Sequence, residues 1–282
     1  MKPSTITSLI TLLFLIAVGT YVNANHYQIT DWWYLRNYTP SAEVASLATQ
    51  ANMTATGKRL FYRANPQIVT TRSQMINYCA MKDNTVIELG CYLSTDHIYL
   101  MQINQPQLKN EMINTAAYEM LHSAYQRLSN SDRTRIDTQL EQLASQITDP
   151  DITQQIQLYA QTEPGERDDE LYSVIGTEYP NIPSSLAVNY AQYFSNRAVL
   201  VSYYLQFNQV LDGLHAQINQ LNAQIITTKA RMKQYLANGQ VARYNALVPS
   251  VNDTITTYNQ DVVQYNLYAS DLLGQQSAAG TE

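Results

Sequence analysis

The last third of the chain carries a hydrophobic repeat that allows few folds other than paired helices. Apolar residues recur at steps of three and four over residues 211–235, and the same period resumes over 241–272. The pair Asn238-Gly239 separates the two runs. Heptad-like runs on either side of a short turn predict a long antiparallel helical hairpin, which we place at residues 185–275 with a tail at 276–282.

The hairpin leaves its partner undefined. The heptad pattern is compatible with a hairpin whose two helices pack only on each other. It is equally compatible with self-association or with the binding of a partner helix. Pro249 lies inside the second run and predicts a local defect, because an interior proline removes a helical hydrogen bond.

A second constraint is the mostly apolar, uncharged run over residues 6–22, which follows Lys2. Roughly 17 such residues reach the lower limit for spanning a bilayer. We predict a single-pass anchor within residues 1–26, with Lys2 on the cytoplasmic side and the rest of the chain outside the cell. The alternative is a cleaved signal peptide, which would make the protein secreted.

Composition excludes one class of partner. The net charge is −6, only 14% of the residues are charged, and no run of Lys or Arg is present. Nucleic-acid binding needs a basic patch, so we expect no nucleic-acid partner. The length of 282 residues allows one sizeable core.

The two cysteines, Cys79 and Cys91, bear on location. In an exported chain such a pair favours a disulfide, and two free buried thiols are the alternative. Their spacing matches no zinc-ribbon pattern, so we do not interpret them as metal ligands.

Residues 27–184 predict an α+β domain in which helices predominate. Ser41 is a candidate N-cap for a first helix, Leu60-Phe61-Tyr62 is typical of a strand, and a further strand follows Asp96. A helix begins near Gln107, and more helical segments follow, the next one capped by Ser131 or Asp132.

The chemistry of this domain centres on the stretch Tyr118-Glu119-Met120-Leu121-His122. In the zinc-peptidase signature His-Glu-x-x-His, two histidines on one helical face hold Zn²⁺ and the glutamate activates bound water. Here Glu119 occupies the position of the catalytic base and His122 that of the second ligand. Tyr118 stands where the first histidine is expected. The alternative is an ordinary helix in which Glu119 and His122 only pack.

A later segment, Asp169-Glu170-Leu171-Tyr172-Ser173-Val174-Ile175-Gly176, resembles the helix that supplies the third ligand in thermolysin-like gluzincins. The resemblance implies that Glu170 is that ligand, and Glu178 is the rival. With the stretch around Glu119, this segment also resembles uncharacterised single-pass membrane proteins of reduced-genome bacteria. That resemblance implies a zincin-like domain facing outward from an anchor.

The chain departs from that family at Tyr118 and Tyr172, where the family has histidines. A phenol binds Zn²⁺ poorly because its unperturbed pKa is about 10. His97 is a possible substitute ligand. We therefore expect a degenerate site, with zinc possible but no cofactor required.

Three functions remain open. The first is a membrane-anchored, extracytoplasmic binding or scaffolding protein on a former peptidase fold. The second is an active zinc peptidase with an unusual ligand set. The third is a purely structural coiled-coil envelope protein.

Overall fold

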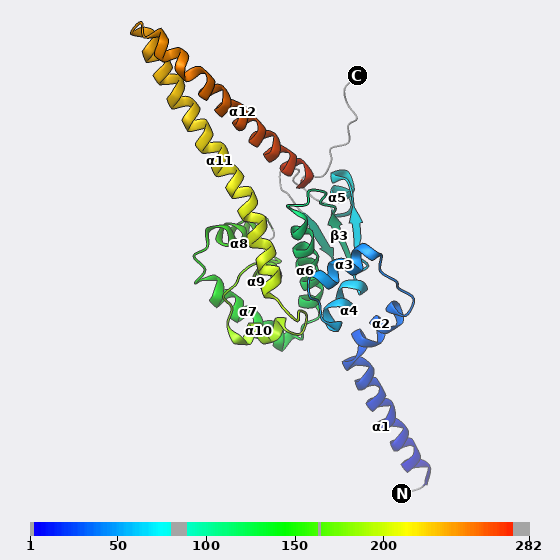
Figure 1. Cartoon of the computed structure of the whole chain (residues 1–282). Coiled ribbons are helices and arrows are strands. Elements are labelled where there is room, and N and C mark those ends of the chain that lie inside the picture. The colour runs from blue at the N-terminus through cyan, green and yellow to red at the C-terminus, as the bar shows by residue number, and fades with distance from the viewer. Residues whose placement is uncertain (1–2, 80–88, 163–164, 273–282) are drawn as a thin grey trace.

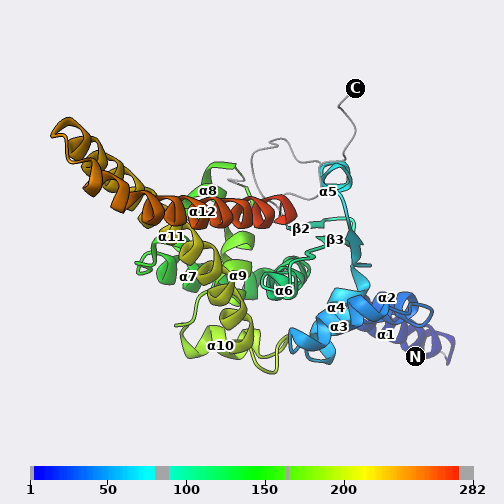
Figure 2. The ribbon, with the colours of Figure 1, turned by 45° about the horizontal axis from the view of Figure 1, so that its top comes forward.

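The computed structural model of the chain describes residues 3–79, 89–162 and 165–272. It shows a helical body with a small sheet, from which two helical extensions project in different directions. Helix α1 leaves one end of the body, and the hairpin of α11 and α12 extends from the opposite end (Figure 1). A second view shows the same separation of the two extensions (Figure 2).

Helices predominate in the described residues, in agreement with the predicted α+β class. The helices are α1 (Pro3–Ala24), α2 (His26–Leu35), α3 (Ala42–Gln50), α4 (Ala55–Arg63), α5 (Arg72–Cys79), α6 (Lys109–Gln126), α7 (Asn130–Ala144), α8 (Pro150–Thr162), α9 (Arg167–Thr177), α10 (Ser184–Tyr190), α11 (Ala198–Ala237) and α12 (Val241–Leu272). The strands are β1 (Gln67–Val69), β2 (Gly90–Leu93) and β3 (His97–Met101).

The three strands form one sheet in the order β1-β3-β2. Strand β1 runs parallel to β3, whereas β2 runs antiparallel to it, with Cys91 opposite Tyr99. Strand β2 therefore lies at an edge of the sheet. The predicted disulfide between Cys79 and Cys91 is present, and it ties the end of α5 to β2.

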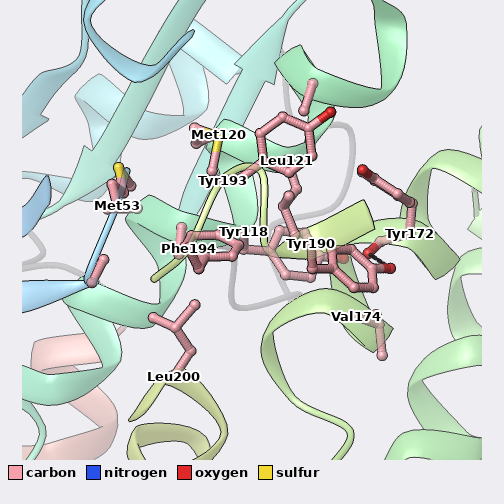
Figure 3. Packing of buried hydrophobic residues seen from close by; sticks show 14 of the residues in the cluster. Met53, Tyr118, Met120, Leu121, Tyr172, Val174, Tyr190, Tyr193, Phe194 and Leu200 are labelled. Atoms are coloured by element: carbon pink, nitrogen blue, oxygen red, sulfur yellow. Dashed lines mark hydrogen bonds between the residues drawn. The ribbon is translucent and has the colours of Figure 1, made fainter. Parts of the chain in front are cut away.

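Helix α6 is the centre of the body. Every residue from Glu111 to Tyr125 is buried, because the sheet, α9 and α11 surround the helix. Gly176 allows α9 to approach closely, since a Cβ there would collide with Leu121. Tyr172 and Tyr190 pack side by side in this core, with ring centroids 5.0 Å apart (Figure 3). The core is thus built around the helix that carries the candidate motif.

The predicted membrane anchor falls on α1. Side chains are described there from Thr11 onward, so residues 6–10 of the apolar run lie outside the described side chains. Among the described residues, no helix is both long enough and apolar enough to cross a membrane. The anchor consequently stays a prediction.

The helical hairpin is present. Helices α11 and α12 pack along each other, and Gly239 makes the turn with a φ of 71°, a left-handed conformation that glycine adopts readily. Helix α12 continues through Pro249. Proline still removes a helical hydrogen bond there, but the helix does not end.

Two local predictions were wrong. Leu60-Phe61-Tyr62 belongs to helix α4, not to a strand, and the Thr54 side chain caps that helix by accepting a hydrogen bond from the Gly57 amide. The helix buries Leu60 and Phe61 together on one face. In addition, α7 is capped by Ser129, which accepts from the Asp132 amide, so that helix begins earlier than Ser131.

A buried ion cluster joins α2 to the body. Asp31 is only 1% exposed, and Arg127 contacts both of its oxygens at 2.8 and 3.0 Å. Arg59 and Arg63 of α4 approach the same carboxylate at 3.5 and 3.6 Å. Three cations around one carboxylate fix the position of α2 against α4 and the end of α6.

Candidate functional site

A pocket of about 530 Å³ opens between strand β2, helix α6 and helix α9. The whole of β2, from Gly90 to Leu93, forms one wall. The other walls bring together the predicted residues Tyr118, Glu119, His122 and Glu170, with Asp169, Tyr159 and Glu166 beside them. Residues predicted from two separate segments thus lie in one place.

The Tyr118 side chain is hydrogen-bonded to Glu170, the residue expected from the resemblance to be a metal ligand. Its hydroxyl donates a hydrogen bond of 2.5 Å to Oε2 of Glu170. Burial, together with the neighbouring Tyr159 and Glu170, raises the pKa of the Tyr118 hydroxyl well above its usual value. Tyr118 is therefore a neutral hydrogen-bond donor in this pocket.

His122 is held between two carboxylates. Its Nδ1 lies 2.8 Å from Oδ1 of Asp169, and its Nε2 lies 3.7 Å from Oε1 of Glu170. Burial by itself lowers the pKa of His122, but the hydrogen bond to Asp169 and the nearby carboxylate charges outweigh it and raise the pKa to about 10. The protonated ring is therefore favoured at neutral pH, with Nδ1 donating to Asp169 and Nε2 in a longer charge contact with Glu170.

Glu119 faces the sheet. A Cβ added to Gly90 would lie 2.7 Å from Oε1 of Glu119 and 2.6 Å from the Thr115 methyl group. Strand β2 consequently approaches α6 this closely only because residue 90 is a glycine. Glu119 as a whole residue is 5% exposed, and it forms part of the pocket wall.

These residues do not fit a zinc site. Zinc needs at least three protein ligands. Of the three expected ligand positions, only His122 and Glu170 carry ligand-type side chains, and the Tyr118 hydroxyl at the third keeps its proton in a hydrogen bond to Glu170. Among the described residues, no group of three His, Cys, Asp or Glu side chains is placed to hold a metal ion.

Three further residues singled out from the sequence lie elsewhere. His97 does not line the pocket; its Nδ1 lies 3.0 Å from the Thr95 carbonyl oxygen. Glu178 is buried but does not line the pocket, and it accepts a hydrogen bond of 3.4 Å from Gln155. Tyr172 is a core residue, and its hydroxyl donates a 2.5 Å hydrogen bond to Asn189.

Sequence reasoning missed Asp169 and Tyr159. Asp169 directly precedes Glu170 on α9, so its adjacency was a usable signal for a second carboxylate at the site. Tyr159 comes from α8, and no spacing in the sequence connects that helix to α6. Only the packing of α8 against α9 brings it into the pocket.

Comparison with known proteins gives no relative. No family model matches the chain, and neither the curated proteins nor the solved structures include a significant match. The zincin-like fold therefore remains a prediction from the two motifs.

Proposed function

We propose that the chain is a non-catalytic binding protein that captures an extended peptide along strand β2. The observation that carries this proposal is the position of β2. It is an edge strand of the sheet, and all four of its residues line the pocket. A half-buried edge strand beside a pocket supports recognition by strand addition, in which the peptide backbone supplies hydrogen bonds and the pocket selects a side chain.

The hydrogen-bond pattern of β2 identifies the groups that a peptide would meet. The Met101 amide donates to the Leu89 carbonyl at 2.8 Å, which makes that a hydrogen-bonded pair. Such pairs alternate along an antiparallel ladder, so the backbone groups of Gly90 and Tyr92 point away from β3. No described strand pairs with that outer edge.

The charge of the pocket supports a cationic ligand. Four acidic residues line it, and His122 is the only basic group among the lining residues. Carboxylates on the walls of a cleft concentrate positive charge there. We therefore infer that the favoured peptide places a lysine, an arginine or an amino terminus near Asp169 and Glu170.

We also propose that this domain faces outward from a membrane. Two observations support the location. The described side chains of α1 from Thr11 to Ala24 are all exposed, including the apolar ones, and a helix that is apolar all round belongs in a core or a bilayer. The disulfide between Cys79 and Cys91 is typical of chains outside the cytoplasm.

Substitution at Tyr92 tests the binding proposal. Tyr92→Pro removes the amide at the outer edge, whereas Tyr92→Ala removes the same ring and keeps the amide. A lost hydrogen bond of about 0.5–1.5 kcal/mol predicts affinity for a labelled, lysine-bearing extended peptide that is roughly 2- to 10-fold weaker in the proline variant than in the alanine variant.

A matched peptide completes the experiment. The same peptide with glutamate in place of lysine is expected to bind more weakly to the unmodified protein, measured by fluorescence anisotropy. Equal affinity of both peptides, or of both Tyr92 variants, would show that the pocket does not recognise peptides in this way.

A further inference from the structure

The distal part of the helical hairpin differs in charge from the rest of the chain. Between Asp212 and Asp253 the sequence has no acidic residue, and it contains Lys229, Arg231, Lys233 and Arg243. These four cations add +4 to a chain whose total is −6, so the remaining residues carry −10. We call residues 226–243 the hairpin tip.

The cations of the hairpin tip are available to a ligand. All four are exposed, and in the described part of the chain no carboxylate forms an ion pair with any of them. Arg243 instead lies over the ring of Tyr235 at 5.8 Å from its centroid. An unpaired basic patch on an acidic protein is complementary to a negatively charged partner.

Apolar side chains at the same place indicate what kind of partner this is. Leu236 and Val241 flank the turn and are 56% and 52% exposed, and Ile226 is 61% exposed. Basic residues beside exposed aliphatic ones are the composition of segments that lie in the interface of an anionic bilayer, where the aliphatic groups enter the acyl boundary. An acidic protein surface would use the charges but leave these apolar groups in water.

We propose that the hairpin tip binds the surface of an anionic lipid bilayer. Helix α11 is 40 residues long, which places the tip on the order of 60 Å from the start of that helix. Figures 1 and 2 show the tip and α1 at opposite ends of the molecule. The bilayer that the tip contacts is therefore not the one that α1 would enter.

The test uses the full chain with a polarity-sensitive dye. The two native cysteines are joined, so Asn238→Cys supplies a single reactive thiol at the tip. Val188→Cys, on α10 of the body and 71% exposed, is the matched position. The probes are vesicles of phosphatidylcholine with and without phosphatidylglycerol. We expect the dye at 238 to shift to the blue only with the anionic vesicles, and the dye at 188 not to respond.

Charge variants decide whether the basic residues are responsible. Each cation near an anionic surface contributes about fivefold in affinity, so Lys229→Gln, Arg231→Gln and Lys233→Gln together should weaken the response on the order of a hundredfold. The control variant replaces three cations of the body, Lys58, Lys109 and Arg135, by glutamine. The dye response of this variant to anionic vesicles should be unchanged.

Two results would overturn the proposal. One is a dye response at 238 that is equal for neutral and anionic vesicles, or equal in the two triple variants. The other is an equal response to soluble polyglutamate, which would assign the tip to an acidic polymer instead of a bilayer.

Discussion

The Tyr118 hydroxyl donates a hydrogen bond to Glu170, the residue that the sequence resemblance proposed as a zinc ligand. Tyr118 thus stands where the first zinc ligand was expected, and its hydroxyl is hydrogen-bonded to the residue expected as the third ligand. His122 lies between Asp169 and the same Glu170, with Nδ1 on Asp169. Hydrogen bonds thus connect the side chains at the positions where zinc ligands were expected.

Replacing Tyr118 by histidine should create a zinc site. The variant would place histidines at 118 and 122 on one helical face, with Glu170 opposite, which is a complete set of three protein ligands. We expect near-stoichiometric zinc in Tyr118→His after dialysis, and little in the unmodified protein, measured by atomic absorption. Adding His122→Ala should remove the metal again. Stoichiometric zinc in the unmodified protein would contradict the assignment of the pocket as metal-free.

Glu178 should make the protein less stable as the pH rises. Burial, with a smaller contribution from Glu170, raises the pKa of Glu178 to about 8 in the folded protein. The unfolded chain releases this proton near pH 4.5, so between about pH 4.5 and 8 the folded state binds more protons than the unfolded state. The free energy of unfolding therefore falls by up to about 1.4 kcal/mol for each unit that the pH rises in this range. Glu178→Gln should flatten that slope in urea unfolding at several pH values. An unchanged slope would show that Glu178 does not titrate in this range.

Removal of Asp31 should be strongly destabilising. Its carboxylate is buried beside three arginines, and its loss leaves Asp96 as the remaining carboxylate partner of Arg63 and Arg127. Because Asp96 still offsets part of the charge, we expect Asp31→Asn to reduce the free energy of unfolding by about 1–3 kcal/mol. Asp132→Asn is the control, because its pair with Arg135 is exposed and its loss should cost less than about 1 kcal/mol. Equal effects in guanidinium unfolding would contradict the buried cluster.

Gly90 should not tolerate a side chain. Alanine there would bring a methyl group within 2.7 Å of Glu119, so α6 and β2 must separate. We expect Gly90→Ala to cost about 1–3 kcal/mol of stability and to weaken peptide binding. Gly213→Ala in α11, where nothing lies within 4 Å, should instead stabilise by about 0.4–1 kcal/mol. A stable Gly90→Ala protein with unchanged binding would show that the approach of β2 to α6 is unimportant.

The features that could be predicted from the sequence are those that a local residue pattern determines. The hairpin follows from a repeat sustained over two long helices, and the Ser41 cap follows from a hydroxyl at a helix start; its side chain does accept from the Val44 amide. The strand prediction for Leu60-Phe61-Tyr62 was wrong because such residues inside a short helix look like a strand when the Thr54 cap before them is ignored.

The site was predicted only as far as its helices allowed. Glu119, His122 and Glu170 were found because each stands in a recognisable helical motif. The pairing of His122 with Asp169 and the role of β2 depend on how α9 and the sheet pack around α6. Such contacts join residues far apart in the sequence, and no spacing rule encodes them.

The disulfide has a consequence for ligand binding. Both Cys79 and Cys91 line the pocket, so the bond forms part of the surface that a captured peptide would cover. Ligand and reductant then compete for the same space. The rate at which a bulky thiol opens the bond becomes a measure of how much of the pocket is filled, without any label on either molecule.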